Sequence, residues 1–294
     1  MRRLDIGIAS YREVEKLRKA VFHLRQNSTT DWRLLIVDNP CAGSQTRPYI
    51  EQLCREDSRI ESLFMAENVG YAGAVNEILA WAKTEYIAYL DHDAYVQTHG
   101  WDEALCGYLD RFHEIGLIFP NGGAYQIIRG PYTEVLWQAG FCWIVTRMCM
   151  SDVINDGKTA RMEAFDTTIG HQNEVDFAQR VRMAGYKCAA AVEVGVLHDA
   201  TATNEAASSE RIGRGIVEWM NKWCRYFGGK NLNYHSPNVL RFEDWPPTAL
   251  YLEEYWKQRL NGINSQPEVV NIEGRPYDLI KVPRFSGFYQ GRVI

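Results

Sequence analysis

The chain has 294 residues, of which 46% are hydrophobic and 23% charged. It is long enough for one large α/β domain or two smaller ones, with a substantial core that needs no disulfide or metal cross-links for stability. Its net charge of -5 argues against nucleic acid as a partner, because proteins that bind a phosphate backbone concentrate positive charge. The seven cysteines include no C-x-x-C pair, which argues against a disulfide framework or a zinc ribbon.

No stretch of the sequence approaches the ~18 consecutive apolar residues of a membrane span. The basic residues at the N-terminus are not followed by an apolar run of signal-peptide length. We therefore expect a cytoplasmic protein. It could still touch the inner face of a membrane, because the last twenty residues contain four basic side chains and one Asp.

The first hundred residues alternate between apolar runs and segments with apolar residues at helical spacing. This pattern predicts strands at 4–10, 32–38, 60–66 and 86–90, with helices at 13–26, 45–55 and 70–83 between them. Strands that alternate with helices form parallel sheets covered on both faces. We predict an α/β fold with a doubly wound, mostly parallel, Rossmann-like sheet.

The next hundred residues continue this pattern less regularly. They predict helices at 101–113 and 174–184, strands at 116–120, 139–146 and 188–197, and a loop at 121–137. Further on, an aromatic stripe predicts a helix at 210–227, a shorter helix follows at 250–260, and 262–294 shows no clear period. We expect a domain at 1–204, built from halves at 1–97 and 98–204, and a helical or irregular C-terminal extension at 205–294.

Two carboxylates close the fourth predicted strand, in Asp91-His92-Asp93. Side chains two residues apart on extended chain point the same way, and parallel sheets bind ligands at the carboxyl ends of their strands. Two like charges placed together are costly unless a cation lies between them. The pair is therefore a candidate site for Mg²⁺ or Mn²⁺. The alternative is a turn with two solvated Asp side chains.

Two further segments end strands at the same predicted edge. Asp38 closes the second strand, where its carboxylate could accept hydrogen bonds from a base edge or a ribose. The segment 67–76 follows the third strand, and its Gly70 and Gly73 could let backbone amides approach a phosphate or sugar. These glycines could equally serve tight packing of helix on strand. The spacing is not G-x-G-x-x-G, so the dinucleotide fingerprint is absent.

These segments together resemble a known family. Ala9-Ser10-Tyr11, Val37-Asp38-Asn39, the Asn68-x-Gly70-Tyr71-x-Gly73-x-x-Asn76 motif and Asp91-His92-Asp93 follow one another in the order seen in family 2 glycosyltransferases of the GT-A fold. The third motif is most similar to the branch of rhamnosyl- and galactofuranosyltransferases. The resemblance covers roughly residues 4–200, with each motif at a predicted strand end.

The second half adds matches to the same family. The segment 173–177 resembles the family's E-D-x-D motif, in which Glu174 takes the position of the general base. Asp176 is the alternative base, and both acids could instead only stabilise the start of a helix. His198 resembles the family's late metal-binding His, and an imidazole suits Mn²⁺. Asp166 and Trp137 resemble residues of the acceptor site, although a Trp at this point could equally pack in the core.

The resemblance implies a set of site residues. The donor would contact Ala9, Tyr11, Asp38, Asn68, Gly70, Asn76 and Asp91, and the metal would be held by Asp91, Asp93 and His198. The half at 1–97 would bind the nucleotide sugar, and the half at 98–204 would carry the base and the acceptor site. The extension at 205–294 would serve acceptor specificity, membrane docking or formation of a homodimer.

The function implied is an inverting, metal-dependent glycosyltransferase. It would move a sugar from a UDP-, dTDP- or GDP-sugar to a hydroxyl of a glycan, polysaccharide or glycolipid, with Mn²⁺ or Mg²⁺ as cofactor. A retaining glycosyltransferase on the same fold is the closest alternative, and two alternatives of other kinds remain open. A sugar nucleotidyltransferase also uses an α/β sheet and a metal, but it carries a Gly-rich loop after its first strand, where this chain has Ser10-Tyr11-Arg12-Glu13. A catalytically degenerate binding module of the same fold is the other alternative.

Overall fold

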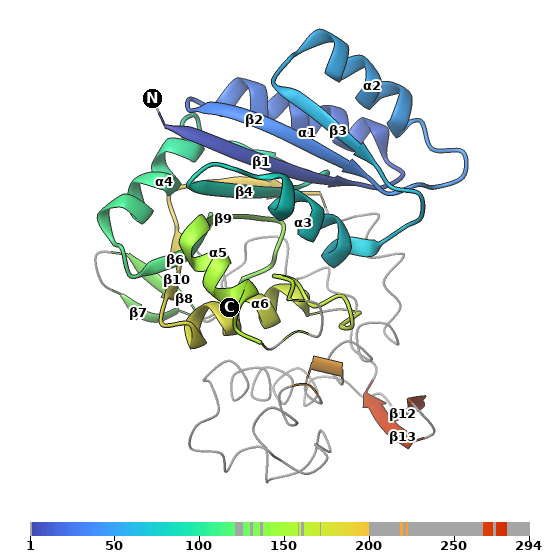
Figure 1. Ribbon diagram of the computed structural model, residues 1–294, viewed down its shortest axis with the longest axis vertical. Coiled ribbons are helices and arrows are strands. Elements are labelled where there is room, and N and C mark those ends of the chain that lie inside the picture. The colour runs from blue at the N-terminus through green and yellow to red at the C-terminus, as the bar shows by residue number, and fades with distance from the viewer. Residues whose placement is uncertain are drawn as a thin grey trace.

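A computed structural model describes residues 2–120, 126–129, 132–135, 138–157, 159, 162–170, 172–199, 218–219, 222, 267–272 and 275–280. Its centre is a nine-stranded sheet with the order β3-β2-β1-β4-β9-β6-β10-β8-β7 (Figure 1). The half at 1–97 supplies β1 (Arg3–Ser10), α1 (Val14–Asn27), β2 (Asp31–Asp38), α2 (Thr46–Glu56), β3 (Ile60–Phe64), α3 (Gly70–Trp81), β4 (Tyr86–Asp91) and β5 (Ala94–Val96).

The half at 98–204 continues the same sheet. It contains α4 (Trp101–Arg111), β6 (Ile115–Pro120), β7 (Gln126–Arg129), β8 (Thr133–Val135), β9 (Cys142–Thr146), α5 (Arg147–Ile154), α6 (Asn173–Met183), β10 (Lys187–Ala191) and β11 (Val196–His198). Strands β3, β2, β1 and β4 pair in parallel, as do β6 and β10. Strand β9 runs antiparallel between β4 and β6. The predicted α/β fold with a mostly parallel sheet is thus confirmed.

Helices cover both faces of the sheet (Figure 1). One buried cluster joins the sheet to α3, α5 and α6, and a second joins it to α1, α2 and α4. Helix α3 lies directly on β1, because a Cβ at Gly7 would fall 2.1 Å from Ile78 Cγ2. Both faces are therefore covered, and parallel sheets of this kind bind ligands at the edge where the strands end.

Several elements differ from the sequence prediction. The predicted loop at 121–137 contains the short strands β7 and β8; β7 pairs with β8, and β8 pairs with β10. The predicted strand at 188–197 is interrupted by a turn, so that β11 leaves the main sheet and pairs antiparallel with β5. Neither β5 nor α5 was predicted. Both β5 and β11 have three residues, too few for a period to show in the sequence.

Most of the predicted C-terminal extension lies outside the described residues, including the predicted helix at 250–260. Within it, Glu218, Trp219 and Lys222 are helical. Strands β12 (Pro267–Ile272) and β13 (Arg275–Ile280) form an antiparallel hairpin in a stretch where no regular element was predicted. Among the residues that the structure describes, no helix is long and apolar enough to cross a membrane.

Candidate active site

The carboxyl ends of three parallel strands bring the first predicted residues level with one another. Ala9 of β1 is in register with Val37 of β2 and with Asp91 of β4. Asp38 follows one residue later, opposite Ser10. Tyr11 leaves β1 at this edge, partly buried, with the Arg12 guanidinium 4.8 Å from the centre of its ring. The edge thus gathers the candidates that the family resemblance assigned to the donor.

Asp38 is a buried carboxylate at this edge, with a side chain only 6% exposed. Burial raises its pKa, while nearby Thr46 and Ser10 hydroxyls act in the opposite direction. Its Oδ1 has no hydrogen-bond partner in the described structure, and neither has the Ser10 hydroxyl. Buried polar atoms are rarely left unpaired in folded proteins. This carboxylate therefore suits a ligand that donates a hydrogen bond.

The glycine-containing segment forms the entrance to α3. Asn39 fixes it, accepting from the Val69 amide at 3.1 Å and donating to the Gly70 carbonyl at 3.5 Å. Asn68 accepts from the Gly70 amide at 2.9 Å, and Gly70 has φ of 70°, a conformation that favours glycine. Asn68 and Gly70 thus shape a turn at the edge of the site.

Asn76 has a different environment from the other donor candidates. Its amide donates to the Phe165 carbonyl at 2.8 Å, and its carbonyl oxygen accepts from the Phe165 amide at 2.9 Å. These two bonds tie α3 to the segment before α6. Gly73, on the same helix, leaves room for Val69, since a Cβ there would lie 2.7 Å from Val69 Cβ. Both residues therefore have a packing role in the structure.

Asp91, Asp93 and His198 form a three-residue cluster with the geometry of a metal site. One ligand atom from each lies within 4.8 Å of the others. The His198 Nε2 atom is 3.2 Å from Asp93 Oδ1 and 3.5 Å from Asp91 Oδ2. Two carboxylates and one imidazole fit Mn²⁺, and the carboxylates alone would also suit Mg²⁺. The structure thus brings His198 together with two acids that lie far earlier in the sequence.

Neighbouring residues hold this cluster in place. The Tyr89 hydroxyl donates to Asp91 Oδ1 at 2.5 Å, and the Phe141 ring stacks on the His198 imidazole at 4.7 Å. Such outer contacts orient the ligands of metal sites. On the other side, the Lys16 ammonium lies 3.9 Å from Asp93 Oδ2.

The two carboxylates of the cluster differ electrostatically. Burial and the charge of Asp93 raise the pKa of Asp91 to about 6. Burial also acts to raise the pKa of Asp93, but the hydrogen bond and charge of His198 outweigh it, so this pKa lies below its usual value. Placing the two acids together therefore costs free energy that a bound cation would recover.

Glu174 is the second residue of α6. It packs against the chain at Gly140, where an added Cβ would lie 3.0 Å from Glu174 Cβ and 2.8 Å from the Tyr71 hydroxyl. Burial raises the pKa of Glu174 to about 7, and the charge of Asp91 adds to the effect. A carboxylate with such a pKa is suited to take up a proton near neutral pH. Glu174 thus has the environment of a general base.

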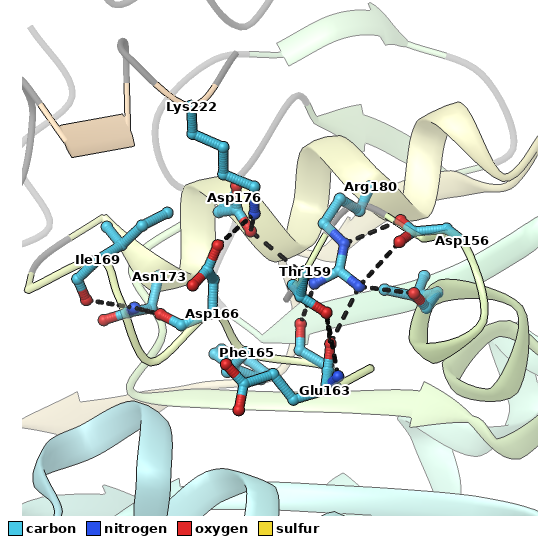
Figure 2. Close-up of polar contacts among 12 residues, drawn as sticks. Asp156, Thr159, Glu163, Phe165, Asp166, Ile169, Asn173, Asp176, Arg180 and Lys222 are labelled. Carbon is cyan, nitrogen blue, oxygen red and sulfur yellow. Dashed lines mark hydrogen bonds and ion pairs between the residues drawn. The ribbon is translucent and has the colours of Figure 1, made fainter. Parts of the chain in front are cut away.

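Asp176 and Asp166 face a different partner. Both are buried, and the Lys222 ammonium lies 2.7 Å from Asp176 Oδ2 and 2.8 Å from Asp166 Oδ2 (Figure 2). Asp166 also accepts from the amide and hydroxyl of Thr168. The structure therefore engages both acids in a buried ion-pair network with Lys222. Trp137, the other acceptor candidate, lies outside the described residues.

The sequence interpretation did not include three residues that support the site. Tyr89 lies two residues before Asp91 on the same strand, so the alternation of a strand could have placed it beside that carboxylate. Lys16 and Lys222 come from helices far from their partners in sequence. No local pattern distinguishes them from surface lysines.

Comparison with known sequences identifies the family. Residues 5–141 match the family described as glycosyl transferase family 2. This stretch, just under half of the chain, is thus similar to family 2 glycosyltransferases. This match spans β1 to the segment before β9, and it includes Asp91 and Asp93. The family resemblance drawn from the sequence motifs is thereby confirmed. The rhamnosyl- and galactofuranosyltransferase branch stays a prediction.

Two bacterial relatives are similar to part of the chain. TuaG of Bacillus subtilis (strain 168), provisionally named a teichuronic acid biosynthesis glycosyltransferase, is 33% identical over 84 residues, which are 29% of this chain and 33% of TuaG. The teichoic acid poly(glycerol phosphate) polymerase of Staphylococcus epidermidis (strain RP62A) is 28% identical over 121 residues, which are 41% of this chain and 16% of the polymerase. The alignments thus span one third or less of these relatives.

Solved structures share the fold. A mannosyltransferase of Pyrobaculum calidifontis, in complex with GDP-Man and Mn²⁺, superimposes with a TM-score of 0.60 at 14% identity, covering 88% of this chain and 81% of that one. TarS residues 1–349 of S. aureus, in complex with UDP-GlcNAc, gives a TM-score of 0.57 at 12% identity, covering 97% and 98%. At this identity the likeness supports the GT-A fold alone.

Proposed function

We propose that the protein is an inverting, metal-dependent glycosyltransferase that moves a sugar from a nucleotide-diphosphate sugar to an acceptor hydroxyl. The observation that carries this proposal is the arrangement of Asp91, Asp93 and His198 within 4.8 Å of one another, with Glu174 close enough for the Asp91 charge to raise its pKa. A divalent cation and a general base are the two elements that such a transfer requires.

Each group has a defined role in the proposed reaction. Asp38, Ala9 and Tyr11 would hold the base and ribose of the donor at the strand ends, beside the turn formed by Asn68 and Gly70. The cluster of Asp91, Asp93 and His198 would bind Mn²⁺ or Mg²⁺, which would stabilise the charge that develops on the leaving nucleoside diphosphate.

Glu174 would remove the proton from the acceptor hydroxyl as that oxygen attacks the anomeric carbon. The new glycosidic bond forms on the face opposite the departing diphosphate, so one displacement inverts the configuration. The proton stays on the Glu174 carboxylate until solvent removes it. A pKa raised by burial makes this carboxylate a stronger base than an exposed Glu.

The donor and acceptor are proposed as classes. The solved neighbours were captured with GDP-Man and UDP-GlcNAc, so these two nucleotide sugars are the first donors to test, followed by dTDP-sugars. The two relatives are named for teichuronic acid and poly(glycerol phosphate), so polymers of these types lead the acceptor panel. We expect the reaction to take place in the cytoplasm, with acceptors on a glycan or a glycolipid.

The test is release of nucleoside diphosphate from each nucleotide sugar, with and without acceptor, in Mn²⁺, in Mg²⁺ and in EDTA. We expect release that depends on the metal and is accelerated by an acceptor, and a product whose anomeric configuration, measured by NMR, is opposite to that of the donor. Pyrophosphate release from a nucleoside triphosphate and a sugar phosphate would instead support a nucleotidyltransferase. Donor binding without any turnover would support a binding module, and retained configuration would refute the inverting mechanism.

A further inference from the structure

One helical turn from beyond residue 204 docks on the part of the molecule that presents Glu174. Trp219 is 1% exposed and belongs to the buried cluster that includes Phe165 and Phe177. Glu218 Oε2 accepts a hydrogen bond from the Gly170 amide at 2.7 Å. Lys222, four residues after Glu218, is also helical. The turn is therefore seated by both apolar and polar contacts.

Lys222 is the centre of this contact (Figure 2). Its ammonium lies 2.7 Å from Asp176 Oδ2 and 2.8 Å from Asp166 Oδ2. Asp176 is fully buried, Asp166 is 4% exposed, and the Lys222 side chain is 14% exposed. Two carboxylates in such a setting repel each other unless a cation is shared between them. Lys222 thus joins the segment before α6 to α6 itself.

The nearby Arg180 is committed elsewhere. Its Nε atom donates to Asp156 at 2.8 Å, and its remaining nitrogens donate to backbone carbonyls that include those of Ala164 and Val153. The distance from Arg180 Nη1 to Asp176 Oδ2 is 3.9 Å, which is beyond a hydrogen bond. Of these two cations, Lys222 is the one in direct contact with both Asp166 and Asp176.

The first turn of α6 depends on such external contacts. Its N-cap, Gln172, has φ of 68° and makes no side-chain cap. The side-chain amide of Asn173 instead donates to the backbone carbonyls of Asp166 and Ile169, at 2.9 and 2.8 Å. Glu174 follows directly. A backbone conformation that is costly for a residue other than glycine persists only where its surroundings fix it.

We propose that Lys222 is a positioning residue of the transfer reaction. By bridging Asp166 and Asp176 it fixes the start of α6, and thereby the place of the Glu174 carboxylate against the acceptor hydroxyl. This inference rests on the proposed role of Glu174 as the general base. It assigns to the C-terminal extension a part in positioning the general base, and it gives Asp166 and Asp176 a structural partner that is neither a substrate nor a metal.

The experiment compares Lys222→Met with Lys222→Arg and with a matched control, Lys187→Met. Lys187 pairs with Glu134 at 3.4 Å and is 43% exposed. A displacement of about 1 Å in a catalytic group can cost about 100-fold in rate. We therefore expect Lys222→Met to lower kcat by about 10- to 100-fold, with the KM for UDP-GlcNAc or GDP-mannose unchanged. Lys222→Arg should retain most of the activity, and Lys187→Met all of it.

Hydrogen exchange provides a second measurement that needs no activity. In Lys222→Met, the amides of residues 166–177 should exchange faster while those of α1 stay protected. Glu174→Gln should keep the protection of these amides and lose turnover. If the wild-type protein turns over no donor at all, the proposed function fails, whereas faster exchange at 166–177 would still support the role of Lys222 in fixing α6.

Three results would overturn the inference. The first is unchanged protection of residues 166–177 in Lys222→Met, and the second is a rise in KM with unchanged kcat. The third comes from the double variant Lys222→Met with Asp176→Asn, which removes the repulsion and so guards against unfolding of the single variant. We expect the double variant to fold and to keep a low kcat. Full recovery of kcat would show that Lys222 only offsets charge.

Discussion

Replacing Glu174 by Gln should greatly slow transfer and at the same time stabilise the protein. The substitution preserves the shape of the side chain next to Gly140, but an amide cannot accept the proton of the acceptor hydroxyl. A positioned general base contributes about 10²- to 10⁴-fold in rate, which is about 3 to 5 kcal/mol of the activation barrier. We expect a loss of kcat of this size with donor affinity unchanged.

The gain in stability follows from the raised pKa. The pKa of Glu174 is 4.5 in its ordinary state and about 7 in the fold, so the folded protein holds this proton more tightly than the unfolded chain. Its favourable effect is complete below pH 4.5 and is lost as the pH rises through 7. Above pH 7 the ionised carboxylate costs at most about 3 kcal/mol, at 1.36 kcal/mol per pH unit. The Gln variant does not carry this cost.

Two measurements check this reasoning. The first is nucleoside diphosphate release with donor affinity determined separately by calorimetry, and the second is urea unfolding in EDTA at pH 5 and pH 8. The stability difference between variant and wild type should be larger at pH 8. Glu77→Gln, an exposed carboxylate of α3, is the control and should change neither quantity. Turnover close to the wild type in Glu174→Gln would refute the role as base. A stability difference independent of pH would refute the electrostatic reasoning.

The wild-type kcat/KM should fall about tenfold per pH unit below the pKa of Glu174. In saturating Mn²⁺ the midpoint of this fall should lie between pH 4.5 and 7, because a cation on Asp91 removes one cause of the raised pKa. A pH profile that is flat above pH 4.5 would contradict this. Asp93→Asn should raise the Mn²⁺ concentration for half-maximal activity by about 10-fold or more, measured by metal titration. Gly7→Ala should destabilise the fold by about 1–3 kcal/mol in urea unfolding, because its Cβ would meet Ile78. Gly107→Ala, in an open position of α4, should be neutral or slightly stabilising.

The sequence was most informative where strands and helices alternate sharply. The predicted strands and helices up to residue 90 agree with β1 to β4 and α1 to α3 to within two residues at nearly every end, because buried parallel strands and amphipathic helices have different periods. Short or peripheral elements such as β5, β7 and β8 carry too few residues for a period. Their formation depends on pairing with strands that lie far away in the sequence.

The site could be predicted in part for the same reason. Asp38, Asp91 and Asp93 end strands, and the rule that parallel strands finish at one edge places them together. The family resemblance added His198 and Glu174, which no local pattern could join to that edge. The ion-pair network of Lys222 was not foreseen, because its members Asp166 and Asp176 also fit simpler interpretations, as an acceptor contact and as a helix-start acid.

The pairing of β5 with β11 explains how a residue near position 200 reaches the acids of β4. The two strands are antiparallel, with His198 in register with Ala94, and the Asp199 amide donates to the Asp93 carbonyl at 2.8 Å. Backbone bonds thus set the separation of His198 from Asp93 before any ion binds, so the entropic cost of assembling the ligands is met largely by folding. A break in this pairing should therefore weaken metal binding more than it weakens the main sheet. The turn that separates β10 from β11, where the sequence predicts one strand at 188–197, therefore matters for the site. It lets the chain leave the main sheet and brings His198 to Asp91 and Asp93.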